Sequence, residues 1–332
     1  MSGFWEGRRV LVTGHTGFKG AWLTLWLHAL GARVTGFAAG PPTAPSLFEA
    51  ARVGELVDDI RGDVRDAGAV RSACERARPE LVFHLAAQAI VRAALDDPAG
   101  TYAVNVLGTA HVLEAARDAA VVCVTSDKCY APGDGPHVEG DPLGGRDPYS
   151  ASKAAQELVA GAYRSSLGVR VATARAGNVI GGGDWGRDRL LPDLARARES
   201  GAPVVLRHPD AVRPWQHVLD PLAGYLTLGE RLRGASEWAA AWNFGPADAQ
   251  PVRWVVDRVR ERWPLDVRVE PPADTVEAPA LRLDASAARE RLGWTPRLDA
   301  SAAVAATVSW YDQVRAGSDA RAVTLTQIEE LT

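Results

Sequence analysis

Lysine is almost missing from this sequence of 332 residues: it occurs only at Lys19, Lys128 and Lys153, although 37 residues are Lys or Arg. On a solvated surface the two side chains carry the same charge, and this chain uses Arg there almost without exception. Only the lysine amine can lose its proton in a protein. Each remaining Lys is therefore a candidate for chemistry that a guanidinium group cannot perform.

Cysteine is scarce as well, and the three cysteines form no C-x-x-C motif and have no His at ligand spacing. This argues against a disulfide framework and a structural zinc site, so we expect free thiols and no metal. No apolar run reaches the roughly 20 residues of a membrane span, and no signal-type apolar core follows the first residues. Charged residues of both signs are present and the net charge is −4, which disfavours nucleic-acid and membrane partners. We expect a soluble protein of the cytoplasm.

Hydrophobic residues make up 47% of the chain, which excludes a disordered protein. Nearly continuous apolar runs predict strands buried on both faces, at 9–13, 33–37, 57–60, 81–85, 121–125 and 169–175. Stretches with helical periodicity separate them, at 18–30, 67–77, 101–116 and 149–167. This alternation predicts an α/β fold with a doubly wound parallel sheet of the Rossmann type.

The length exceeds the roughly 250–300 residues that one hydrophobic core usually serves, so we expect two lobes. The alternation ends near residue 180, and shorter elements rich in Pro, Trp and Arg follow. We predict a dinucleotide-binding domain over 1–180, to which 212–240 return. A smaller, interleaved α/β substrate lobe would comprise most of 181–211 and 241–332, with helices at 285–292 and 300–315.

Three glycines, Gly14, Gly17 and Gly20, lie between the first predicted strand and the first predicted helix. Such glycines permit a tight turn and a close approach of backbone N–H groups to a pyrophosphate at the helix amino terminus. The second strand ends without the acidic residue that usually holds the ribose of NAD, and without an Arg for a 2′-phosphate. The local sequence leaves NAD and NADP open. Asp63, after the third strand, is a candidate for an adenine contact.

A second constellation follows the fifth predicted strand. Ser126, Asp127 and Lys128 lie at its carboxyl end, where ligands bind in such sheets. Tyr149 and Lys153 are four residues apart in the next helix, so both lie on one helical face. We expect the lysine to lower the pKa of the Tyr149 phenol, which makes this residue a candidate base.

Several stretches of the chain resemble a known family. The sequence is similar to the extended short-chain dehydrogenase/reductases and, within them, to the nucleotide-sugar 4,6-dehydratases, most of all those that act on CDP-glucose. The likeness extends from residue 5 to about residue 310. The glycine loop and the Tyr/Lys pair are common to the whole superfamily. The Asp-Lys pair, the Gly-Gly-Gly-Asp-Trp loop and the Arg-Pro-Trp-Gln-His segment are typical of a smaller group within it. The similar stretches are 12–20, 84–88, 125–130, 175–185 and 213–218.

The resemblance implies an NAD-dependent hydro-lyase of deoxysugar biosynthesis, which oxidises C4 of the glucosyl group, eliminates water across C5 and C6 and returns hydride to C6. Tyr149 would take the C4 hydroxyl proton, Ser126 would bind the C4 oxygen, and Lys153 would hold the cofactor ribose. Lys128 would remove the C5 proton, and Asp127 would protonate the departing hydroxyl. Better-known dTDP-glucose dehydratases have Asp-Glu at this pair, and a lysine must be neutral to act as a base.

The resemblance also implies a set of binding residues. It implies in addition a homodimer, formed through helices 101–116 and 149–167, or a higher homo-oligomer. The cofactor NAD would contact Gly14, His15, Thr16, Gly17, Phe18, Lys19, Gly20, Asp63, Val64, Leu85, Ala86, Ala87, Asn105, Tyr149 and Lys153. The nucleotide-sugar substrate, most readily CDP-glucose, would contact Gln88, Arg92, Asn178, Arg189, Arg213 and His217.

Alternatives stay open at this point. The substrate could carry another nucleobase, since the nucleobase rests on resemblance alone. A nucleotide-sugar 4-epimerase or ketoreductase would need Ser126, Tyr149 and Lys153, but no acid–base pair beside the serine. A nucleotide-sensing module without catalysis would have no need of the Tyr149–Lys153 pair.

Overall fold

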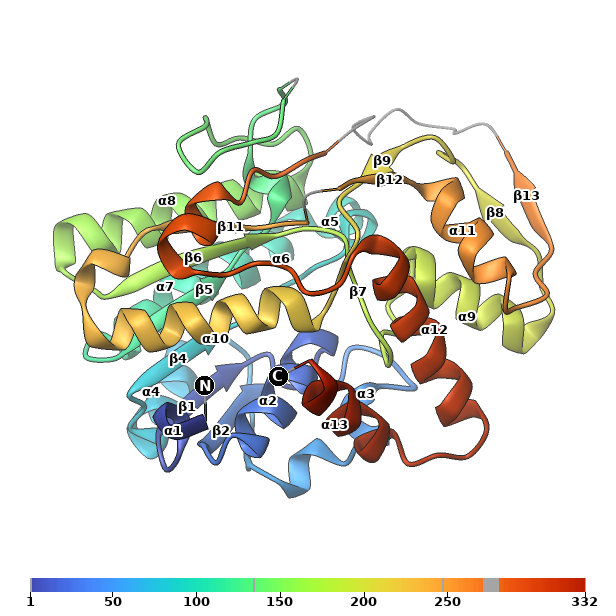
Figure 1. Ribbon diagram of the computed structural model, residues 1–332. Coiled ribbons are helices and arrows are strands. Elements are labelled where there is room, and N and C mark those ends of the chain that lie inside the picture. Colours follow the sequence, from blue (N-terminus) through green and yellow to red (C-terminus); the bar gives the residue numbers. More distant parts are fainter. Residues whose placement is uncertain (1, 134, 247, 271–280, 332) are drawn as a thin grey trace.

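The computed structural model describes residues 2–133, 135–246, 248–270 and 281–331. Its centre is a seven-stranded parallel sheet in the order β11-β6-β5-β4-β1-β2-β3 (Figure 1). The strands are β1 (Arg9–Thr13), β2 (Arg33–Ala38), β3 (Asp58–Arg61), β4 (Leu81–His84), β5 (Ala120–Val124), β6 (Val171–Ala176) and β11 (Ala241–Phe244). The predicted doubly wound parallel sheet is confirmed.

Helices cover both faces of the sheet and divide its core in two. On one face lie α2 (Phe18–Ala29) and α10 (Leu219–Gly234), and on the other α4 (Ala67–Ala77), α7 (Gly108–Ala115) and α8 (Pro148–Leu167). Successive strand residues point to opposite faces, so Val10 and Val12 join the first core while Leu11 joins the second. This double burial explains why the strands read as continuous apolar runs.

The helix predicted over 101–116 is interrupted. The structure has α6 (Pro98–Tyr102), a π-helical segment (Ala103–Leu107) and then α7. The widened turn holds Asn105, whose side chain bonds to the main chain of Gln88. Such π segments are frequent at functional sites, and they leave no periodicity that a sequence pattern would reveal.

The smaller lobe lies beyond the carboxyl ends of the central strands (Figure 1). It contains α9 (Leu190–Ser200), α11 (Val252–Arg260) and the paired strands β8 (Val204–Leu206) and β13 (Val267–Val269). Two short pairs join the lobes: β7 (Val179–Ile180) with β10 (Gln216–His217), and β9 (Val212–Arg213) with β12 (Gln250–Pro251). The remaining longer helices are α12 (Ala300–Arg315) and α13 (Ala320–Glu330). Helix α12 packs against α11 and β10, and α13 packs against α12 and α2.

One strand of the central sheet comes from the segment that we assigned mostly to the smaller lobe. Residues 241–244 form β11, the edge strand of the central sheet beside β6. The reason is apolar burial, since Trp242 and Phe244 are both completely buried in the core shared with α10. Among the described residues, no helix combines the length and the apolar character that crossing a bilayer requires.

Candidate active site

The segment that contains Ser126, Asp127 and Lys128 lies at the carboxyl end of β5. Asp127–Cys129 form a single turn of 3-10 helix, and we call residues 125–130 the catalytic turn. Helix α8 packs against this turn and begins after Asp147, whose side chain caps the helix by accepting a hydrogen bond from the Ser150 N–H. The fold therefore places both predicted catalytic segments side by side.

Hydrogen bonds connect the catalytic candidates directly. Tyr149 hydrogen-bonds with Ser126, and the Ser126 hydroxyl donates to Asp127 Oδ1 at 2.9 Å. The second carboxylate oxygen of Asp127 is buried and has no partner among the described residues. A Cβ at Gly177 would lie 1.6 Å from this oxygen, so only glycine leaves room for the carboxylate. Gly177 is thus part of the site, although we did not name it from the sequence.

Burial controls the acidity of the Tyr149–Lys153 pair. It raises the pKa of Tyr149 to about 12, against the opposing effect of the Ser126 hydrogen bond. It also lowers the pKa of Lys153 to about 8. The Lys153 amine donates to Gln156 Oε1 at 2.9 Å and to the Val124 carbonyl at 3.4 Å. The expected lowering of the Tyr149 pKa is not found in the protein alone, because desolvation of the phenolate outweighs the favourable charges.

Lys19 is closer to the catalytic groups than its place in the glycine loop indicated. Burial, together with repulsion from Arg189 and Lys153, lowers the pKa of Lys19 to about 7. The carboxylates of Asp127 and Asp184 act in the opposite direction. The amine therefore belongs to the same charge cluster as the predicted catalytic residues.

The glycine loop has the geometry that a pyrophosphate requires. Gly14 has a φ of 76°, and a Cβ there would lie 2.6 Å from the Ala86 backbone nitrogen. A Cβ at Gly20 would lie 2.0 Å from the Gly14 carbonyl oxygen. Gly17 is the N-cap of α2, and no side chain caps the helix there. The open backbone N–H groups and the positive end of the helix dipole fit the anionic centre of a dinucleotide.

The segment after β4 lies against this loop. The Leu85 N–H donates to the Thr13 carbonyl at 3.0 Å, and the Ala86 N–H lies 3.3 Å from the Thr13 hydroxyl. Asn105 is fully buried and donates to Ser152 Oγ as well as to the Gln88 carbonyl. Its side chain thus ties the predicted cofactor segment 85–88 to α8.

The His15 ring lies in the protein interior. Its Nε2 lies 2.9 Å from Asp59 Oδ1, and the ring fills the space that a side chain at Gly36 would take. Burial lowers the pKa of His15, so the ring adds no charge at neutral pH. Any contact of residue 15 with the pyrophosphate would have to come from its backbone. Of the candidates near the adenosine end, Asp63 is half-exposed and forms an ion pair with Arg65.

Arg61 lies at the carboxyl end of β2, where the sequence has no acidic residue for the cofactor ribose. Arg61 of β3 pairs in register with Ala38, and its guanidinium donates to the Ala39 carbonyl at 3.3 Å. The same group lies over the Phe48 ring at 4.7 Å and forms an ion pair with Asp59. We did not predict Arg61 from the sequence, because it belongs to β3 and not to the second strand.

Two of the predicted substrate residues, Arg189 and Arg92, form ion pairs with carboxylates of the 184–188 loop. Arg189 forms an ion pair with Asp184 at 3.0 Å and contributes to the electrostatics of Tyr149. Arg92 of α5 (Val91–Asp96) is half-exposed and lies 3.5 Å from Asp188, which connects the Rossmann domain to the loop before α9. Both guanidinium groups remain accessible for phosphate recognition.

The other predicted substrate residues are more constrained. The Gln88 amide is held by Ile90 and Thr101, and Asn178 adopts a left-handed backbone with a φ of 46°. Arg213 is buried in β9. His217 is fully buried with its ring edge-on to Trp22. The structure does not support a substrate contact for His217, because no part of its side chain reaches the surface.

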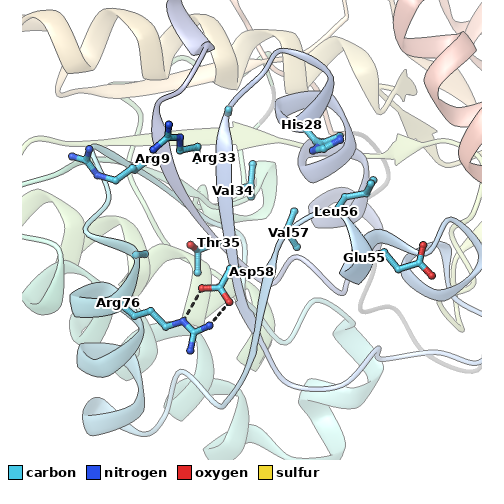
Figure 2. A pocket seen from close by; sticks show the side chains of 12 residues that line it. Arg9, His28, Arg33, Val34, Thr35, Glu55, Leu56, Val57, Asp58 and Arg76 are labelled. Atoms are coloured by element: carbon cyan, nitrogen blue, oxygen red, sulfur yellow. Dashed lines mark hydrogen bonds and ion pairs between the residues drawn. The ribbon is translucent and has the colours of Figure 1, made fainter.

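An open hollow of about 540 Å³ lies elsewhere, at the amino ends of β1, β2 and β3 (Figure 2). Its lining includes Arg9, His28 and Arg33, and Arg76 closes one side by a bidentate ion pair with Asp58. Ligands of doubly wound sheets bind at the opposite, carboxyl ends of the strands. The hollow is therefore separate from the catalytic turn.

Comparisons with known proteins agree with this geometry. Residues 10–241 match the model of the NAD dependent epimerase/dehydratase family. A CDP-glucose 4,6-dehydratase of Salmonella typhimurium is 44% identical over 95% of this chain and 94% of its own length. A dTDP-glucose 4,6-dehydratase of Streptomyces antibioticus is 32% identical over 92% and 93%. The solved structure of DesIV, a dTDP-glucose 4,6-dehydratase from Streptomyces venezuelae with NAD and TYD bound, superposes with a TM-score of 0.82 at 26% identity, covering 93% of this chain and 98% of that one.

Each of these relatives covers more than nine-tenths of the chain. The expected resemblance to nucleotide-sugar dehydratases is confirmed, and so is the expected cofactor NAD. The chain belongs to the NAD dependent epimerase/dehydratase family.

Proposed function

We propose that this protein is a CDP-glucose 4,6-dehydratase that converts CDP-glucose to CDP-4-keto-6-deoxyglucose and water. The observation that carries the proposal is the pairing of Asp127 and Lys128 on the turn beside Ser126 and Tyr149. Support for the substrate comes from the CDP-glucose 4,6-dehydratase that is 44% identical over nearly the full chain.

The first step is oxidation of the C4 hydroxyl. Tyr149 would accept the hydroxyl proton, and the Ser126 hydroxyl would turn from Asp127 to donate a hydrogen bond to the same oxygen. The pKa of Tyr149 is about 12, so the phenol is protonated at neutral pH. The step therefore requires that the phenolate is stabilised when cofactor and substrate are bound. Lys153 would provide this stabilisation from one turn along α8. Bound NAD would supply reversible acceptance of the hydride from C4.

The second step removes water across C5 and C6. A ketone at C4 makes the C5 hydrogen acidic, because the resulting carbanion is delocalised as an enolate. Lys128 would take this proton, and Asp127 would protonate the departing C6 hydroxyl. Lys128 is half-buried and lies one residue after Asp127 on the catalytic turn. The stored hydrogen ends on C6, so the reaction involves no net oxidation.

A 4-epimerase or ketoreductase is the second candidate, since the family includes epimerases. Such an enzyme would use Ser126, Tyr149 and Lys153 in the same way. These reactions require no general acid and base for C5 and C6. The buried Asp127 carboxylate, accommodated by Gly177, would then have no function in the reaction. This difference favours dehydration.

The proposal is tested with purified protein, NAD and, separately, CDP-, dTDP-, UDP- and GDP-glucose. We expect CDP-glucose to lose the mass of one water and to give the alkali-induced ultraviolet absorbance of a 4-keto-6-deoxy sugar. Water loss from a different nucleotide sugar would change only the nucleobase of the proposed substrate and would leave the proposed reaction in place. Inversion at C4 or net reduction of the cofactor without water loss would replace the proposal by the epimerase or reductase.

The same proposal includes a homodimer in the cytoplasm. Large apolar side chains are exposed along α5, α6, the π-helical segment and α8, namely Leu95, Tyr102, Leu107, Leu158 and Leu167. These elements pack against one another within the chain, so their outer surfaces are neighbours. A second copy would cover this surface. The three free cysteines, all of them buried, fit a reducing compartment.

A further inference from the structure

A buried ion pair lies beneath the catalytic turn. Glu157 of α8 and Arg175 of β6 approach to 2.7 Å, and each side chain is at most 4% exposed. Buried charges are costly unless further hydrogen bonds satisfy them. Here the Glu157 carboxylate also accepts from the hydroxyls of Thr125 and Thr173, at 2.5 and 2.7 Å. Neither member of the pair belongs to the sites that we predicted from the sequence.

This ion pair holds both ends of the catalytic turn. Thr125, which donates to Glu157, directly precedes Ser126. At the other end, the Tyr130 hydroxyl accepts from Arg175 Nη1 and donates to Asn243 Oδ1, both at 2.7 Å. The acid and the base of the proposed elimination lie between these two anchors.

The same pair sets the position of the turn relative to the catalytic helix. Glu157 lies four residues after Lys153 and eight after Tyr149, so all three project from one face of α8. Arg175 in turn lies two residues before Gly177, which accommodates the Asp127 carboxylate. A shift of the ion pair would therefore move Asp127 and Lys128 relative to Tyr149.

We propose that Glu157 and Arg175 are positioning residues for the elimination step, acting through Thr125 and Tyr130. This inference rests on the proposed dehydratase function. The amino-terminal end of α8, which holds Tyr149, has its own cap at Asp147. At the Ser126 end, the Thr125 N–H donates to the Ala174 carbonyl at 3.0 Å, so the sheet holds the main chain beside the residue that acts at C4. At the other end, the contacts of the Tyr130 ring and hydroxyl add to a main-chain bond from the Gly144 N–H to the Cys129 carbonyl at 2.9 Å. Asp127 and Lys128 lie between these two ends. Loosening the links should thus affect removal of the C5 proton more than oxidation at C4.

Two threonines provide a matched test. Thr125 and Thr173 are both buried and both donate to the same carboxylate, but only Thr125 belongs to the catalytic turn. Thr125→Val and Thr173→Val remove one equivalent hydrogen bond each. Tyr130→Phe removes the hydroxyl at the other end of the turn and keeps the ring that stacks on His137. Melting temperatures of all three variants report the purely structural effect.

The readouts are kcat and KM for CDP-glucose, solvent deuterium exchange at C5, and the near-ultraviolet absorbance of reduced nicotinamide during turnover. For Thr125→Val and Tyr130→Phe we expect kcat and C5 exchange to fall by about tenfold to a hundredfold, with KM little changed, because small misplacements have effects of this size. Reduced cofactor should accumulate, since C4 is still oxidised. Thr173→Val should keep the wild-type balance between the two steps.

The inference would be overturned if Thr125→Val and Tyr130→Phe slowed oxidation and elimination equally. It would also be overturned if Thr173→Val slowed elimination more than oxidation, as expected for the two turn variants. Unchanged C5 exchange in both turn variants would overturn it as well. The wild-type enzyme separates this result from the parent proposal: if it does not dehydrate CDP-glucose, the proposed function fails. If it does and the turn variants behave as wild type, only the positioning role fails.

Discussion

Two of the three lysines of this arginine-rich protein, Lys19 and Lys153, lie close enough to interact electrostatically, and Lys128 stands on the neighbouring catalytic turn. Burial lowers the pKa values of Lys19 and Lys153 to about 7 and 8. Amines in this range can exist in both protonation states near neutral pH. The rarity of lysine in the sequence was therefore a useful guide to the site.

The first prediction concerns Lys128. Replacing it by Met should leave C4 oxidation in place but reduce C5 exchange and product formation by about 10²–10⁴-fold, the usual contribution of a general base. Lys128→Arg is the matched control, because it keeps the positive charge but cannot lose a proton. Both variants should be equally impaired. Full activity of either one would exclude Lys128 as the base.

A second residue-scale prediction concerns Asp220 of α10. Its Oδ1 accepts from the Arg297 N–H at 2.7 Å, whereas Oδ2 is buried without a partner among the described residues. Burial raises the pKa of Asp220 to about 6 from an ordinary value near 4. The folded state then holds the proton more tightly than the unfolded state, so this group's contribution to stability falls as pH rises from about 4 to 6.

Asp220→Asn removes this titration. The free energy of unfolding of the variant, relative to wild type, should increase between pH 4 and pH 7 by up to about 3 kcal/mol, because each pKa unit corresponds to 1.36 kcal/mol. Thermal or urea unfolding at a series of pH values measures the difference. A difference that does not change with pH would show that Asp220 is not the titrating group.

The candidate catalytic residues could be predicted to lie together because each motif is local: the Ser126–Lys128 run and the Tyr149–Lys153 spacing can be recognised in the sequence alone. Residues that depend on distant segments were missed or misplaced. His15 turns inward because Gly36 of another strand makes room for it, and Gly177 matters only because Asp127 faces it. No local pattern contains such pairs.

At the scale of secondary structure, the glycine loop and β2 depend on one another. A Cβ at Gly36 would lie 2.3 Å from the His15 ring. We predict that Gly36→Ala destabilises the protein by roughly 1–3 kcal/mol, the usual effect of overpacking. His15→Ala should relieve the clash, so the double variant should be more stable than the sum of the single effects predicts. A double-mutant cycle by urea unfolding measures this coupling, and strictly additive effects would contradict it.

Most elements could be predicted from apolar periodicity, because the strands are buried on both faces and the helices on one. The exceptions have tertiary causes. The helix over 101–116 contains a π-helical turn that holds Asn105 against Gln88. The edge strand β11 has only four residues and follows a long helix, so its pairing with β6 was not visible in its own sequence.

At the scale of the whole molecule, the proposed dimer makes a direct prediction. Leu158 on α8 is 64% exposed in the apolar surface, and Leu158→Arg should convert the dimer to a monomer in size-exclusion chromatography with light scattering. Val269→Arg is the control, because Val269 is equally exposed but lies on β13 of the smaller lobe. A dimer that persists in Leu158→Arg, or a wild-type monomer, would contradict this interface.

The central claim is that one active site oxidises C4, eliminates water and returns the same hydrogen to C6. The most direct measurement uses CDP-glucose that carries deuterium at C4, with the wild-type protein, NAD and ordinary water. The account predicts a 4-keto-6-deoxy product that has lost one water and carries the deuterium on C6. Deuterium that is found again on C4 of an epimer, or that is retained in the cofactor without water loss, would contradict it.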